Sequence, residues 1–118
     1  MTRAIENRIG AIFIPVQNIE AAREWYCKLL DLPVEGEILF GHLFCVPVTA
    51  GTGLVLDSKI FDPDSIRNTP LFHFNTVDIQ RAYASLQKKG VELLTEIENG
   101  HWFTFKDPDG NVLMVSKC

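Results

Sequence analysis

Two stretches of this 118-residue chain repeat one another at a constant distance of 60 residues. Residues 12–30 read IFIPVQNIEAAREWYCKLL, residues 72–90 read FHFNTVDIQRAYASLQKKG, and the two align without a gap. In each copy a short apolar segment leads through an Asx residue into a helical pattern. Self-similarity of this kind indicates two copies of one supersecondary unit, so the second half of the chain should fold like the first.

The Asx residue of each copy stands where a helix should begin. Asn18 and Asp78 can accept hydrogen bonds from the first free N–H groups of a helix, so we expect them to be N-caps. The residues behind them recur at spacings of three and four, and Gly90 is suited to the C′ position of the second helix. The predicted buried stripes are Ile19, Ala22, Tyr26 and Leu29 in the first helix and Ile79, Ala82, Tyr83 and Leu86 in the second.

Strand-like runs follow each helix. They cover residues 37–48, 52–56, 92–97, 101–106 and 112–116. Each half is therefore expected to be a βαβββ module with mostly antiparallel strands, which makes the chain an α+β protein. We predict one domain over residues 1–118, with a first module at 9–57, a polar connector at 58–70 and a second module at 71–116.

The sequence Asp107-Pro108-Asp109-Gly110 is well matched to a type I turn. Asp at the first position can bond the backbone, Pro at the second has its φ preset, and Gly at the fourth tolerates positive φ. The turn leads into residues 112–115, a strand without any charged side chain.

Composition excludes several classes of function. A formal charge of −4 argues against a nucleic-acid ligand. The basic pair Lys88-Lys89 is explained by the end of a helix. The three cysteines, Cys27, Cys45 and Cys118, form no CxxC pair. No signal-like or membrane-spanning segment is present, so we expect a cytoplasmic protein with reduced thiols and no membrane partner.

A duplicated βαβββ module whose second copy ends in DPDGN resembles the glyoxalase/bleomycin resistance/dioxygenase superfamily, also called the vicinal oxygen chelate fold. The similar phrases are AIFIPVQNIEAAREWYCKLLDLPV, FHFNTVDIQRAYASLQKKGVEL and FKDPDGNVLMV, and the resemblance spans residues 9–116. It implies sheets that enclose a cavity, with the helices on their outer faces.

The resemblance also implies four metal-ligand positions, and all four are apolar in this chain. Enzymes of the superfamily usually place a His seven residues before each Asx cap and an acid three residues after the Asn of DPDGN. Those positions are Ala11, Leu71 and Met114, and the further acid of the first module aligns with Val55. Because alkyl groups and a thioether are not the imidazole, carboxylate or thiolate ligands of such metals, we expect no metal and no other cofactor.

Alternation along the strands sorts side chains between the helix and the expected cavity. It directs Phe13, His73, Asn75 and Met114 toward the cavity, together with Val112 and Ser116. Such a surface is mainly apolar and aromatic with a few polar groups, which is typical of small-molecule sites. We take Phe13, His73, Asn75, Trp102 and Met114 as the candidate ligand-binding residues.

Two of these residues have alternative explanations. His73 either bonds a ligand, with a weaker case for a catalytic base, or is a buried neutral imidazole bonded to a carbonyl. Trp102 either stacks on a ligand or covers the core. His42 and His101 raise the further possibility of a relocated three-histidine metal site with His73, although their spacing is not typical of zinc ligands. Cys27 and Cys45 are interpreted as packing residues.

Three functions remain open. The chain is a metal-free protein that sequesters a partly aromatic or apolar small molecule, or a metal-dependent lyase, isomerase or dioxygenase with displaced ligands, or a module whose cavity is filled. The first is favoured by the apolar ligand positions. A homodimer is expected in each case, because isologous pairing is the commonest form of oligomer.

Overall fold

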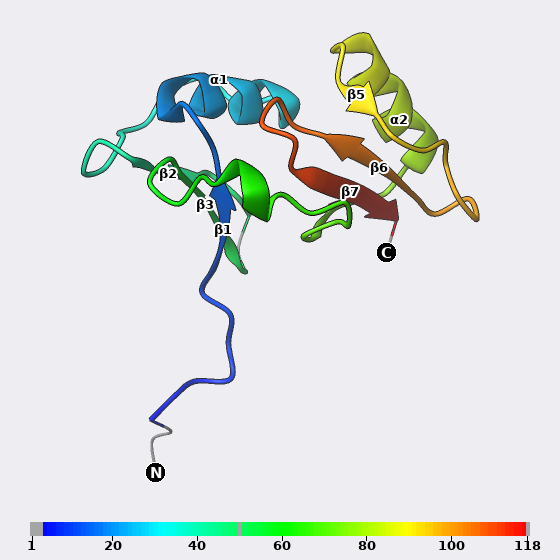
Figure 1. Cartoon of the computed structure of the whole chain (residues 1–118). Helices are drawn as coiled ribbons and strands as arrows, with labels where there is room; N and C mark the ends of the chain where they lie inside the picture. Colours follow the sequence, from blue (N-terminus) through cyan, green and yellow to red (C-terminus); the bar gives the residue numbers. More distant parts are fainter. Residues whose placement is uncertain (1–3, 50, 118) are drawn as a thin grey trace. The chain divides into compact units, whose positions relative to one another are not determined.

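The computed structural model describes residues 4–49 and 51–117, which form two compact units that divide between Phe61 and Asp62. Each unit contains one sheet and one α-helix (Figure 1). The elements of the first unit are β1 (Ala11–Pro15), α1 (Ile19–Leu29), β2 (Leu43–Val46) and β3 (Gly53–Asp57). The central strand β3 runs parallel to β1 and antiparallel to β2.

The second unit adds one strand to the same arrangement. It begins with a short 3₁₀ helix, η1 (Pro63–Ser65). Its further elements are β4 (His73–Thr76), α2 (Ile79–Lys88), β5 (Glu92–Leu93), β6 (Trp102–Lys106) and β7 (Val112–Lys117). The sheet order is β4-β7-β6-β5, with β4 parallel to β7 and the other pairs antiparallel. The predicted α+β class with two tandem modules is therefore confirmed.

Both helices begin and end as local chemistry requires. Asn18 Oδ1 accepts from the Ala21 N–H at 3.0 Å, and Asp78 Oδ1 accepts from the Arg81 N–H at 3.1 Å, so both predicted N-caps are confirmed. Gly90 has φ +75° and follows the last helical turn, as expected for C′. Neither helix in the described part of the chain has the length and apolar character of a membrane span.

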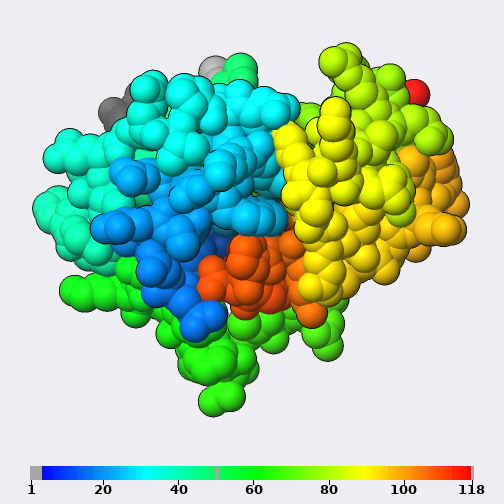
Figure 2. Space-filling model, turned by 90° about the horizontal axis from the view of Figure 1, so that it is seen from above, coloured from blue at the N-terminus to red at the C-terminus, as the bar shows by residue number. Residues whose placement is uncertain are grey.

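Each helix packs on one face of the sheet in its own unit. The helix-side residues of the first sheet include Ile14 and Leu56, which are fully buried, and α1 contributes the buried Tyr26 to this core. Figure 2 shows the molecule from the side of α1. There the side chains of α1 and of the loop that follows it, coloured blue to cyan, form a continuous surface. In the second unit Phe103 is fully buried and its ring meets that of Tyr83 edge to face at 5.1 Å.

Corresponding strands of the two sheets pair in the same register. Phe13 pairs with Val55 and Val55 with Cys45 in the first unit, just as His73 pairs with Met114 and Met114 with Thr104 in the second. The next row is Pro15, Asp57 and Leu43 in the first sheet and Asn75, Ser116 and Trp102 in the second. The repeat therefore extends beyond the first strand and helix into the pairing of the remaining strands.

The predicted type I turn is present and is held by a buried carboxylate. The Gly110 N–H donates to the Asp107 carbonyl at 3.1 Å, and Gly110 has φ +92°. Asp107 Oδ1 accepts from the N–H groups of Asp109 at 3.0 Å and Asn111 at 2.8 Å, and its Oδ2 accepts from Asn111 Nδ2 at 2.8 Å. Asp107 and Asn111 are each 4% exposed, so the turn is part of the core.

Some predicted strands are shorter than expected. Only Leu43–Val46 of the run 37–48 is a strand, because a tight turn at Phe40-Gly41 interrupts it and leaves Leu39 as an isolated bridge to Leu43. The run 92–97 likewise contains only the two-residue strand β5.

Candidate functional site on the second sheet

The face of each sheet turned away from its helix, which we call the distal face, carries the residues of interest. On the second sheet the register brings two rows of side chains together. One row is His73, Met114 and Thr104, and the other is Asn75, Ser116 and Trp102. Paired residues on neighbouring strands project to the same side, with side chains about 4.5–5.5 Å apart. Four of the five predicted ligand-binding residues therefore share one surface.

The exposure of these side chains differs across the surface. His73 and Asn75, on the edge strand β4, are exposed, whereas Met114 and Trp102 are half-buried. Thr104 and Ser116 are each 9% exposed. Thr104 is covered by Thr95, whose Oγ1 lies 3.3 Å from Thr104 Oγ1 and accepts from the Thr104 N–H at 3.0 Å.

His73 does not match the alternative of a buried imidazole. Its side chain is exposed, and Nδ1 lies 3.4 Å from the carbonyl oxygen of Phe74, a long contact for a hydrogen bond. The imidazole is directly paired with Met114, so a polar ring and a flexible thioether lie side by side on the distal face. This pairing suits a ligand with both apolar and hydrogen-bonding groups.

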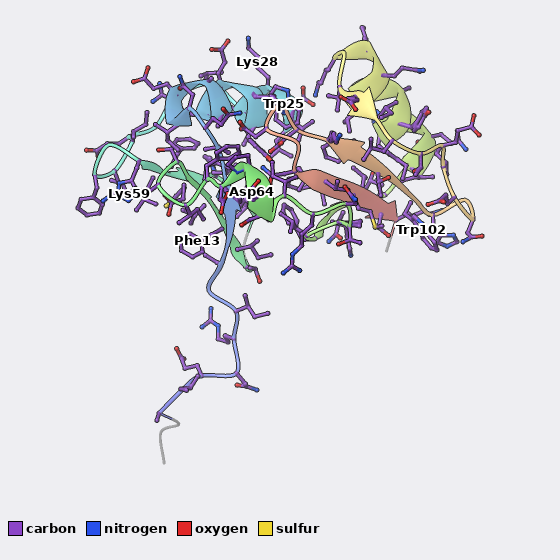
Figure 3. All side chains as sticks on the ribbon, in the orientation of Figure 1. Phe13, Trp25, Lys28, Lys59, Asp64 and Trp102 are labelled. Carbon is purple, nitrogen blue, oxygen red and sulfur yellow. The ribbon has the colours of Figure 1, made fainter. Side chains whose placement is uncertain are left out.

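Trp102 lies at the start of β6, on the side of the sheet away from α2 (Figure 3). Its indole Nε1 donates to Glu98 Oε2 at 3.1 Å, which satisfies the N–H that a half-buried tryptophan requires. The ring is therefore fixed beside Ser116 on the distal face.

Phe13 occupies the equivalent face of the first sheet. Its side chain projects from β1 on the side away from α1 and is 53% exposed (Figure 3). The row that it forms with Val55 and Cys45 is apolar apart from the thiol, whereas the equivalent row of the second sheet contains His73 and Thr104. The two distal faces thus share a backbone pattern and differ in chemistry, and a ligand role for Phe13 stays a prediction.

The four positions where the superfamily enzymes hold a metal do not fit one here. Ala11 and Val55 lie on β1 and β3, Met114 lies on β7, and the Leu71 N–H donates to the carbonyl of Val112 at 3.2 Å, just before β4. Three of these side chains have no donor atom, and the Met114 thioether is not a ligand for a hard divalent cation.

The histidines are not gathered into a replacement site. His42 Nδ1 bonds the Phe40 carbonyl oxygen at 2.9 Å, and His101 Nδ1 bonds the Asn99 carbonyl oxygen at 2.7 Å. His42 belongs to the first unit, whereas His73 and His101 belong to the second. Within residues 4–49 and 51–117, no group of three or more His, Cys, Asp or Glu side chains is placed to hold a metal ion.

The cysteines divide between core and surface. Cys27 is fully buried in α1, as its interpretation as a packing residue requires. Burial raises the pKa of the Cys27 thiol, which keeps it protonated and unreactive. The interpretation of Cys45 as a packing residue was wrong, because it is exposed on the distal face of the first sheet. Cys118 lies outside the described residues.

Thr104 and Glu98 are the residues of this surface that the sequence did not identify. Thr104 has the same strand parity as Trp102, so alternation along β6 would have found it. Glu98 lies outside the strands, and its importance depends on a turn that brings it opposite Trp102.

Comparison with known proteins identifies the family. Residues 8–115 match the model of the Glyoxalase/Bleomycin resistance protein/Dioxygenase superfamily, and the chain belongs to this superfamily. It is 26% identical to the uncharacterized protein YetH of Bacillus subtilis, over 93% of this chain and 98% of YetH. It is 28% identical to biphenyl-2,3-diol 1,2-dioxygenase 2 of Rhodococcus globerulus, over 88% of this chain but only 59% of the dioxygenase.

A solved structure adds a binding protein to these relatives. TnmS3, an antibiotic binding protein from Streptomyces sp. CB03234, superposes with a TM-score of 0.72 at 26% identity, over 98% of each chain. Superfamily membership thus includes both enzymes and binding proteins, so function must be argued from the site.

Proposed function

We propose that this protein binds a small, partly aromatic or apolar molecule on the distal face of its second sheet, without a catalytic metal. The observation that carries the proposal is the strand register, which brings His73, Met114 and Thr104 into one row and Asn75, Ser116 and Trp102 into the next row of the same surface. The surface joins one aromatic ring and one thioether to four polar side chains, so it can contact an apolar ring and also bond polar substituents.

The metal-free part of the proposal rests on the chemistry of the four superfamily positions. A divalent metal needs about three protein ligands, and Ala11, Val55 and Leu71 offer none. The alternative is a metal-dependent lyase, isomerase or dioxygenase, as the similarity to the biphenyl-diol dioxygenase would suggest. It would require a displaced ligand set, and among the residues that the structure describes no group of three or more His, Cys, Asp or Glu is placed to supply one.

The antibiotic-binding role of TnmS3 supports a bound organic molecule as the natural ligand. Sequestration of such a molecule requires affinity but no reacting group. We further propose that the protein acts in the cytoplasm as a homodimer, because two-module members of the superfamily commonly pair.

Two measurements test the proposal. Elemental mass spectrometry of protein purified without metal-affinity steps should give background levels of zinc, nickel, iron and manganese. A near-stoichiometric metal would contradict the metal-free part. A thermal-shift screen of planar aromatic compounds should then yield ligands that raise Tm equally with and without EDTA. A shift that EDTA abolishes would instead favour the metal-dependent enzyme.

A further inference from the structure

Both units contain the same tight hairpin. The first hairpin, residues 39–43, and the second hairpin, residues 98–102, are each closed by a pair of backbone hydrogen bonds between their end residues. Those bonds measure 2.8 and 3.0 Å between Leu39 and Leu43, and 2.7 and 3.3 Å between Glu98 and Trp102. Within each hairpin four residues form a tight turn, in which the His42 N–H donates to the Leu39 carbonyl at 3.1 Å and the His101 N–H donates to the Glu98 carbonyl at 2.9 Å. The two central residues of these turns, Phe40-Gly41 and Asn99-Gly100, have positive φ, as in a type I′ turn.

The hairpins differ in the side chains at their ends. Leu39 and Leu43 of the first hairpin are replaced by Glu98 and Trp102 in the second, where the indole N–H donates to the carboxylate at 3.1 Å. Because the first hairpin closes with two leucines, the turn itself does not require the bond between Glu98 and Trp102. This bond therefore serves the position of the tryptophan ring and not the closure of the hairpin.

A fixed ring has a direct consequence for binding. An aromatic side chain that is already held in one orientation loses less conformational freedom when a ligand stacks on it. Trp102 is held at one end by its backbone pairing with Ser116 on β7 and at the other by Glu98. Hydrogen bonds with an ionised partner are stronger than neutral ones, so a carboxylate is an effective anchor for an indole N–H.

We propose that Glu98 is a positioning residue that fixes Trp102 as a stacking platform for a planar aromatic ligand that carries hydroxyl or carbonyl groups. The polar groups of such a ligand would meet Asn75, Ser116 and His73, and the two rows of the surface include no Lys, Arg, Asp or Glu. Hydroxyl and carbonyl substituents on an aromatic ring match these polar side chains. The inference rests on the proposed function and specifies its ligand class.

The test uses ¹⁵N–¹H NMR of the full chain, in which Trp102 has one indole N–H resonance and Trp25→Phe identifies it by removing the other. The probe is 2,7-dihydroxynaphthalene, with its fully saturated decahydro analogue as the matched non-aromatic compound. The variants are Glu98→Leu, which installs the residue of the first hairpin, and Glu98→Gln, whose amide oxygen can still accept. Glu96→Leu is the matched control, because it removes an exposed acid from the same loop.

Without the probe, Glu98→Leu should shift the Trp102 indole resonance, and Glu98→Gln and Glu96→Leu should leave it near its original position. With the probe, Glu98→Leu should raise Kd about fivefold or more, whereas the other two variants should change it less than twofold. The saturated analogue should bind at least tenfold more weakly than the naphthalene. If Glu98→Leu leaves the indole resonance unmoved or Kd unchanged, the positioning role of Glu98 is wrong. That result would not affect the proposed binding surface.

The proposed function fails in a different way. If saturating probe moves none of the resonances of Asn75, Met114 and Ser116 in the wild-type protein, the ligand class and the surface are both wrong. The NMR spectrum thus separates a failure of the platform from a failure of the binding surface.

Discussion

Replacement of Asp107 by alanine should be the most destabilising single change in the DPDGN turn. The carboxylate accepts hydrogen bonds from the Asp109 and Asn111 N–H groups and from Asn111 Nδ2, at 2.8 to 3.0 Å. Asn111 is 4% exposed, so water cannot readily replace the two bonds made by its donors. The turn directs the chain into β7, the central strand of the candidate site.

The magnitude follows from the donors left without a partner. Each buried unsatisfied donor costs roughly 1–3 kcal/mol, and two of the three donors belong to a buried residue, so the expected loss is about 3 kcal/mol. For a chain of this length 1 kcal/mol corresponds to about 4 °C in Tm, which predicts a fall of about 12 °C. Urea unfolding followed by far-UV circular dichroism and tryptophan fluorescence would measure the free energy.

Asp62 provides a matched control. Its side chain accepts from the Asp64 N–H at 2.9 Å and from Ser65 Oγ at 3.2 Å, but it is exposed, so water can take over both roles. Asp62→Ala should therefore cost no more than about 1 kcal/mol. Equal losses in Asp107→Ala and Asp62→Ala, or a loss below about 1 kcal/mol in Asp107→Ala, would refute the argument from burial.

Three further predictions concern other parts of the chain. Asn18→Ala removes an N-cap and should lower the free energy of unfolding by about 1 kcal/mol in urea titrations. Phe40 has φ +53° and is 86% exposed, so Phe40→Asn should raise Tm by relieving about 1 kcal/mol of strain, whereas Asn99→Phe should lower it. Burial raises the pKa of the Cys27 thiol, so iodoacetamide at pH 8 should label Cys45 and spare Cys27 in peptide maps.

The features that the sequence predicted correctly are local. The caps at Asn18 and Asp78 and the turn at 107–110 depend on hydrogen bonds within about four residues, so residue type and spacing were sufficient. The first hairpin was missed because Phe40 has no intrinsic preference for positive φ, so its residue type did not indicate a turn. Asn99-Gly100, in contrast, is a typical turn dipeptide. The strand expected over 37–48 was accordingly too long.

The features that could not be predicted depend on pairing between distant strands. Alternation within β4 and β7 directed His73 and Met114 to the same side of the sheet, but only the register shows that they are direct neighbours. The bond between Glu98 and Trp102 likewise needs a turn conformation that a sequence pattern does not specify. The sequence can therefore name candidate residues for a surface spread over several strands, but it cannot give their arrangement.

The measurement that tests the central claim most directly is a ¹⁵N–¹H NMR titration of chelator-treated protein with a compound that raises Tm in the thermal-shift screen. We expect saturable shifts concentrated at His73, Asn75, Trp102, Met114 and Ser116, with no metal added. Shifts that cluster away from the distal face of the second sheet, or that occur only after a divalent metal is restored, would contradict it.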